Sequence, residues 1–174
     1  AGGQITATGY GYSAAKGPGA PLNPGLTVRA GSHAGLAHDV GAMEAYGSIA
    51  RPVTYGSGGQ TGAGGGAIRL AVGDTLTLNG SVTADGTSYY RSGAGGSVWI
   101  EAAKLTGAGA VSAKGGSVPT AVECGGGGRI AVTLTGTGSS FADFGGTFSA
   151  RGGATAALAS GAGTVYLREG AWQF

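Results

Sequence analysis

The chain has 174 residues, of which 41 are glycine and only 10% are charged, and its formal net charge is +2. Glycine does not recur at every third position, which excludes collagen, and 41% of the residues are hydrophobic, which excludes a disordered glycine-rich tract. Lysine and arginine form no cluster that could neutralise phosphates, and no apolar run approaches the roughly 18 residues of a membrane helix, so we expect neither a nucleic-acid partner nor a membrane span.

The first recognisable element is the run QITATG at Gln4–Gly9, in which Ile5 and Ala7 alternate with polar residues. A period of two is typical of a half-buried β-strand. The same run returns three times later in the chain, so we expect it to form the first strand of a repeated structure.

Residues 9–64 break this pattern. They carry four of the five prolines and a glycine-rich run from Gly56 to Gly66. A structureless loop of this length is unusual, so we expect an irregular excursion from the first coil that packs on the flank of the repeats or caps one end. Local glycine strands of the polyproline-II type are the alternative.

The excursion also holds the one group that resembles metal ligands or an acid/base pair, namely His33, His38, Asp39 and Glu44. Zinc sites usually have closer spacings, such as two histidines separated by three residues, and no cysteine lies nearby in the sequence. We therefore expect a structural loop, with no cofactor and no catalytic role. Metal binding by His33 and His38 stays open as the alternative.

Residues 65–168 contain two alternating elements, each repeated about every 30 residues. The first element reads GAIRL at Gly66–Leu70, GSVWI at Gly96–Ile100, GRIAV at Gly128–Val132 and GTVYL at Gly163–Leu167. The second is the N-terminal type and reads SVTADG at Ser81–Gly86, AVSAKG at Ala110–Gly115 and TFSARG at Thr147–Gly152. Such units are too short to bury a face alone, but equivalent strands stacked about 4.8 Å apart share one core.

The alternation also predicts which side chains point inward. In the second element Ile5, Val82, Val111 and Phe148 stack on one another, and in the first element Ile68 and Leu70 stack on their equivalents. Glycine doublets before the first-element strands lie where each coil must turn. We predict an all-β fold, a right-handed parallel β-helix (solenoid) of about four to five coils, in a single domain of residues 1–174 with almost no helix.

The residues between these inward positions point outward, and they include Arg69, Trp99 and Tyr166. A flat aromatic ring on a rigid sheet can hold a sugar ring, so these three are candidate contacts for a glycan or a protein partner. We expect Trp99 to be covered by protein, either by the excursion or by a neighbouring subunit.

Nothing in the sequence predicts an enzyme. The eight carboxylates occupy different repeat positions, and no Gly-x-Ser-x-Gly elbow leads from a strand into a helix. Cys124 is the only cysteine, so no intrachain disulfide can form. We expect it to be a buried small side chain, with an intermolecular disulfide as the alternative.

The motif Gly65-Gly66-Ala67-Ile68 and its repeats resemble the glycine-rich β-helix repeats of large bacterial secreted surface proteins, including autotransporter passengers and polymorphic outer-membrane proteins. The resemblance runs from about Gly31 to Arg168. It implies export, display at the cell surface and adhesion, and it offers no catalytic residues to transfer.

The ends of the predicted solenoid would expose unpaired backbone groups, at Ile5 and Thr6 on one side and at Val165 and Leu167 on the other, with Trp172 and Phe174 following. Unlike ends that pair produce an open filament, unless the rotation between copies closes a ring. We therefore expect a secreted, non-enzymatic structural or adhesive module that forms a homo-oligomer or homopolymer and contacts glycans or the cell surface. The alternative is a carbohydrate-binding or polysaccharide-processing β-helix that uses the outward aromatics.

Overall fold

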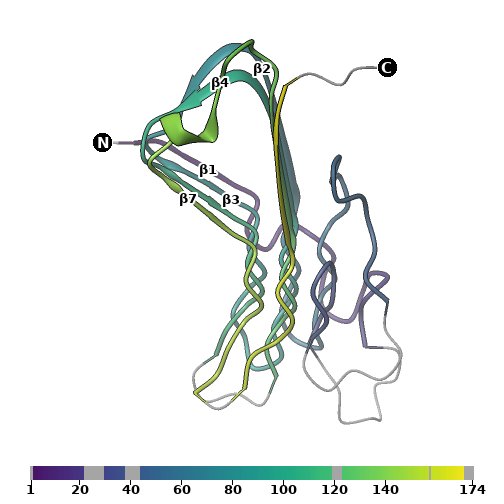
Figure 1. Cartoon of the computed structure of the whole chain (residues 1–174). Helices are drawn as coiled ribbons and strands as arrows, with labels where there is room; N and C mark the ends of the chain where they lie inside the picture. The colour runs from purple at the N-terminus through teal and green to yellow at the C-terminus, as the bar shows by residue number, and fades with distance from the viewer. Residues whose placement is uncertain (1, 22–29, 38–43, 119–122, 157, 171–174) are drawn as a thin grey trace.

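The computed structural model describes residues 2–21, 30–37, 44–118, 123–156 and 158–170. Within these ranges the chain forms two parallel sheets, and the helical content is a single 3-10 turn, η1 (Phe141–Asp143). The architecture is a β-solenoid of about three turns (Figure 1). The predicted all-β parallel fold is confirmed, with fewer turns than the four to five coils expected.

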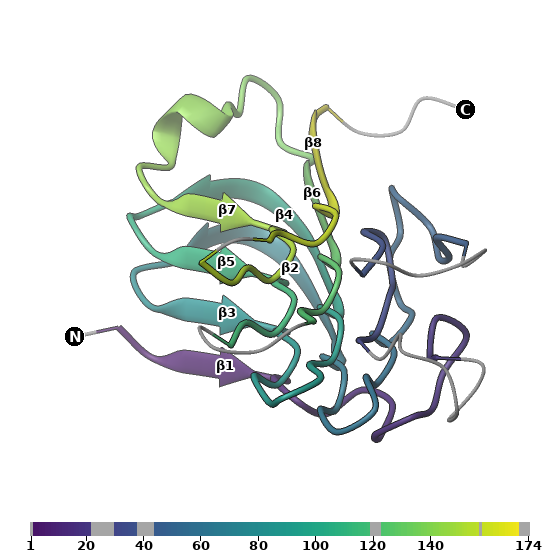
Figure 2. The same ribbon diagram turned by 90° about the horizontal axis from the view of Figure 1, so that it is seen from below.

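The strands alternate between a short sheet and a long sheet. The short sheet contains β1 (Gln4–Thr6), β3 (Ser81–Thr83), β5 (Ala110–Ser112) and β7 (Thr147–Ser149), in that order. The long sheet contains β2 (Ala67–Thr77), β4 (Ser97–Thr106), β6 (Arg129–Leu134) and β8 (Thr164–Glu169). Each coil therefore stacks directly on the one before it, as the ladder from β1 to β7 shows in Figure 2.

The core lies between the two sheets, and its register matches the predicted inward positions. Ile5, Val82, Val111 and Phe148 are consecutive partners across the short sheet. Across the long sheet, Ile68, Val98, Ile130 and Val165 form one column, and Leu70, Ile100, Val132 and Leu167 form the next. In the middle coils the side chains of these columns are fully buried, so the predicted inward positions are correct.

The leucine-containing pieces between the two elements do not form separate strands. β2 and β4 continue past the end of β6 and curve around the corner of the solenoid (Figure 1), where Leu76 pairs with Leu105. The pairing register shifts between Val72 and Thr75, and the Asp74 carboxylate accepts a hydrogen bond from the backbone N–H of Thr75 at 2.8 Å. The extra residue in β2 forms a bulge at the bend where β2 and β4 turn toward the short sheet.

Away from the sheets, the chain runs in extended glycine-rich segments that hydrogen-bond to one another outside any strand. Successive N–H groups of Gly125–Gly128 donate in turn to Gly116 O (3.1 Å), Gly31 O (2.9 Å), Gly161 O (3.0 Å) and Ala113 O (2.8 Å). The first and fourth bonds reach the same neighbouring segment, so the direction repeats every three residues, as in a polyproline-II helix. We call this part of the molecule the glycine bundle.

The described parts of the excursion belong to this bundle and lie beside the outer face of the long sheet (Figures 1 and 2). Gly64 donates to Tyr12 O at 2.9 Å, and Gly31 donates to Ser92 O at 3.0 Å. The excursion thus packs on the flank, as expected, and its hydrogen bonds follow the polyproline-II alternative.

At the C-terminal end, η1 forms a partial cap that the sequence did not predict. The Glu169 carboxylate accepts hydrogen bonds from Ser140 Oγ at 2.9 Å and from the Phe141 backbone N–H at 2.7 Å. Phe141 and Phe144 pack against Phe148, with ring centroids 6.2 and 5.2 Å from it. The cover therefore comes from the connection before β7, while the predicted end residues Trp172 and Phe174 lie outside the described residues.

Candidate interaction surfaces

The predicted outward residues form one row across the long sheet. Arg69, Trp99, Ala131 and Tyr166 are consecutive cross-strand partners on β2, β4, β6 and β8. Trp99 is 8% exposed, and the Arg69 guanidinium carbon lies 4.1 Å from the centre of its ring. Arg69 also forms an ion pair with Glu101 at 3.1 Å. Little of the Trp99 ring face is therefore open to a ligand.

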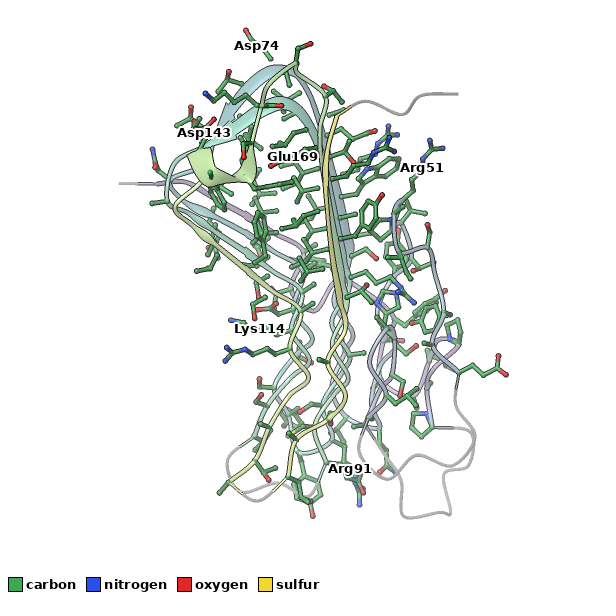
Figure 3. The ribbon with its side chains drawn as sticks, viewed as in Figure 1. Arg51, Asp74, Arg91, Lys114, Asp143 and Glu169 are labelled. Carbon is green, nitrogen blue, oxygen red and sulfur yellow. The ribbon has the colours of Figure 1, made fainter. Side chains whose placement is uncertain are left out.

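The excursion is held on this face by backbone and side-chain contacts. Ser97 Oγ donates to Thr54 O at 2.6 Å, and Pro52 beside it is fully buried. Arg129 donates to Tyr46 O through Nε at 2.9 Å and through Nη2 at 2.8 Å. Figure 3 shows Arg51 at the upper end of the excursion, beside the long sheet. The excursion thus converts the outer face of β4 and β6 into a second, polar interior.

His33 lies at the centre of this interior and is completely buried. Its Nδ1 donates to Gly95 O at 2.8 Å, which leaves Nε2 to accept from Thr54 Oγ1 at 2.8 Å, and its ring packs 4.6 Å from Tyr46. Burial, aided by the charge of Arg129, lowers the pKa of His33 from 6.5 to about 4 against the opposing effect of the Gly95 hydrogen bond. Both ring nitrogens are occupied by protein, so His33 ties the excursion to the solenoid.

The other members of the predicted histidine and carboxylate group do not join His33 in the described structure. His38 and Asp39 lie outside the described residues, and Glu44 is exposed. In the described ranges, no three His, Cys, Asp or Glu side chains gather where they could hold a metal ion.

Cys124 and Asp85 are held by hydrogen bonds between neighbouring segments of the chain. Cys124 is buried, and its carbonyl accepts a hydrogen bond from Ser160 Oγ at 2.5 Å. Asp85 accepts from the Lys114 backbone N–H at 2.6 Å and from Ser112 Oγ at 2.5 Å. Asp85 therefore links successive coils through two neutral hydrogen-bond donors, a hydroxyl and a backbone N–H.

The glycine bundle ends in turns that lie at the opposite side of the molecule from the corner of β2. Figure 3 shows Arg91 at this far end and Asp74 at the corner. Tyr89 and Tyr90, next to Arg91, are 63% and 52% exposed. We call the turn of residues 87–92 the tip loop. Strand periodicity could not predict this exposed loop. The two adjacent tyrosines could have indicated it, because the chain has few aromatic residues.

The two ends of the solenoid expose core side chains. Ile5 is 46% exposed on β1, and Val165 and Leu167 are 43% and 42% exposed on β8, whereas their partners in the middle coils are buried. Thr6 is exposed as well. At the N-terminal end an open pocket lies between β1 and the corner of β2, lined by Ile5, Leu76, Leu78 and Val82 among others.

No family model, curated protein or solved structure matches the chain. Within the ranges that the structure describes, no helix has the length and apolar character needed to cross a membrane.

Proposed function

We propose that this protein is a non-enzymatic structural and adhesive module whose solenoids stack end to end, the C-terminal end of one copy against the N-terminal end of the next. The observation that carries the proposal is the exposure of apolar core columns at both ends, at Ile5 (46%) and at Val165 and Leu167 (43% and 42%). An exposed strand edge with apolar neighbours is a template for pairing with another chain.

The register of the long sheet indicates what such a stack would bring together. In the stack, β8 of one copy would pair with β2 of the next copy in the register that β6 and β8 have within one copy. Val165 and Leu167 would then lie opposite Ile68 and Leu70 of the next copy. Tyr166 meets the next Arg69, which repeats the contact that Arg69 makes with Trp99 at 4.1 Å. Each column of the core would continue without a change of residue type.

The partial cap is compatible with this stack because a hollow lies at the equivalent corner of the other end. η1 contains no buried residue, and it follows β6 at the corner where the chain passes to the short sheet. The open pocket lined by Ile5, Leu76, Leu78 and Val82 lies at the corresponding corner at the N-terminal end of the solenoid. η1 of one copy and this pocket of the next are therefore positioned as projection and recess.

The location and the role outside the cell rest on composition and on the resemblance to surface-protein repeats. A chain with 10% charged residues, one cysteine and abundant glycine is common among exported surface proteins. A stack of rigid coils supplies length and repeated contacts, which is what a surface filament or matrix requires. We place the protein at the cell surface or in the extracellular matrix.

A carbohydrate-binding or carbohydrate-processing role through Trp99 and Tyr166 is the second candidate from the sequence. The 8% exposure of Trp99 and the guanidinium group of Arg69 on its ring give this row little open aromatic surface. We therefore rank it below the structural role.

Sedimentation velocity over a range of concentrations tests the stack. The wild-type protein should form oligomers that lengthen with concentration, whereas Leu167→Lys and Ile5→Lys should each be monomeric. Because each variant keeps one intact end, a mixture of the two should form dimers and nothing longer. Val53→Lys is the matched control, since Val53 is 59% exposed on the excursion and should leave assembly unchanged.

A wild-type protein that stays monomeric at the highest concentration would refute the proposal. So would equal loss of assembly in the Val53 control, or failure of the two end variants to form dimers when mixed.

A further inference from the structure

The tip loop displays the kind of aromatic surface that the long sheet does not. Tyr89 and Tyr90 are adjacent in sequence and more than half exposed, at 63% and 52%, while Trp99 is 8% exposed. A tyrosine ring presents an apolar face and a polar hydroxyl, and loops on a rigid scaffold commonly carry binding residues.

The tip loop is held in one conformation by its own hydrogen bonds. Ser92 Oγ donates to Tyr89 O at 2.7 Å, and Arg91 donates its backbone N–H to Thr61 Oγ1 at 3.0 Å. Thr61 and Gly62 return backbone donors to Arg91 O at 3.3 and 3.0 Å. Because the fold already orders the loop, binding a ligand to the two rings loses less conformational entropy, which favours binding.

Charge at the tip loop is compensated. The Arg91 guanidinium carbon lies 5.1 Å from the centre of the Tyr90 ring, its Nε lies 3.9 Å from a Glu123 carboxylate oxygen, and Nη1 donates to Gln60 Oε1. The arginine supports the ring and is already paired with an acid. A ligand at this surface gains little from carrying negative charge, so a neutral ligand fits best.

The described surroundings of the two tyrosines are polar and small. Ser88 Oγ accepts from the Ser117 backbone N–H at 3.1 Å, and Ser117 Oγ accepts from the Ala154 N–H at 3.0 Å, which links the turns of three successive coils. A stable protein partner usually needs about 800 Å² on each side with an apolar centre. Two rings in a polar rim provide an apolar area closer to that of a few sugar rings.

We propose that the tip loop binds a neutral polysaccharide, with Tyr89 and Tyr90 contacting sugar rings through their apolar faces and Gln60 and Ser88 offering polar atoms to sugar hydroxyls. This site goes beyond the proposed stacking, because the tip loop connects β3 to β4 and so belongs to a coil between the two ends. It also lies at the opposite side of the molecule from the corner of β2, as the positions of Arg91 and Asp74 show in Figure 3. A stack of copies would repeat the site along one side, so weak individual contacts would add.

Binding is tested by saturation-transfer NMR with uncharged hexasaccharides of β-1,4-glucose, β-1,3-glucose, α-1,4-glucose and β-1,4-mannose, alongside a uronic-acid hexasaccharide. The wild-type protein should transfer saturation to at least one neutral oligosaccharide. Tyr89→Ala and Tyr90→Ala should each weaken that binding at least tenfold. Tyr10→Ala is the matched control, because Tyr10 is 77% exposed but lies outside the tip loop, and it should bind like the wild type.

Circular dichroism melts of each variant confirm that the fold is intact, and ring-proton shifts of the wild-type tyrosines on titration give a readout that needs no variant. The proposal fails if no neutral oligosaccharide binds, if only the uronic-acid chain binds, or if binding survives in the Tyr89→Ala/Tyr90→Ala double variant. Monomeric Leu167→Lys should bind as well as the wild type per site, so failure here and failure of stacking are distinguishable.

Discussion

At the scale of single residues, His33 makes the attachment of the excursion sensitive to pH. Its pKa is about 4 in the folded protein and about 6.5 when unfolded, so the unfolded chain takes up a proton first as the pH falls. The free energy of unfolding should be highest above pH 6.5 and decrease by about 3 kcal/mol as the pH falls to 4.

Thermal melts between pH 4 and 7 measure this effect. The His33→Gln variant should lose the His33 contribution to the pH dependence, whereas His38→Gln, at the only other histidine, should keep it. An unchanged pH dependence in His33→Gln would show that carboxylates alone determine it.

The inward and outward phases of the strands give a second prediction at this scale. Val111 is 1% exposed in the middle of a core column, so Val111→Asp would bury a carboxylate and cost about 4 kcal/mol. Thr83 points outward on the neighbouring strand, where its hydroxyl donates to Thr6 Oγ1 at 2.9 Å. Thr83→Asp should cost about 1 kcal/mol or less, and similar losses in urea unfolding for the two variants would contradict the register.

Single residues also mark the limit of prediction from sequence. Period-two alternation identified Val82, Val111, Ile130 and their partners because one face of each strand must be apolar. The same argument could not place His33 against Gly95 or expose Tyr89 at the tip, since these positions depend on how segments without periodicity fold onto the strands.

At the scale of the elements, the glycine bundle explains most of the unusual composition. Turns that require a positive φ account for six of the described glycines. The larger requirement is close backbone approach, because a Cβ on Gly126 would lie 1.9 Å from Gly35 O. From the sequence we expected the glycine doublets at the coil corners, but low-complexity glycine runs did not indicate that whole segments would bundle.

Gly126→Ala tests this explanation. Its methyl group would clash with Gly35 O, so the excursion must move away from the solenoid. We expect the free energy of unfolding to decrease by about 3 kcal/mol. Gly73→Ala is the control, since no atom lies within 4 Å of a Cβ built there and its φ is not positive. That variant should be within about 1 kcal/mol of the wild type. Equal stability of the two variants would mean that the bundle is not tightly packed.

At the scale of the whole molecule, two architectures share one chain. The sheets supply an apolar core whose ends are open, and the glycine bundle carries the tip loop between β3 and β4, in a coil that forms neither end. Stacking and display of the tip loop can therefore proceed together, because neither surface blocks the other. The sequence predicted the open ends from strand repetition, whereas η1 was missed because its segment has no repeat to compare with.

The stack also has a predicted dimension. Each sheet contributes four strand levels per copy, and at about 4.8 Å per level each copy should advance the filament by about 19 Å. Cryo-electron microscopy of the concentrated protein measures this rise directly. We predict filaments with a subunit rise near 19 Å and continuous long sheets across the junctions; isolated monomers, or filaments with a rise that four strand levels cannot produce, would contradict end-to-end stacking.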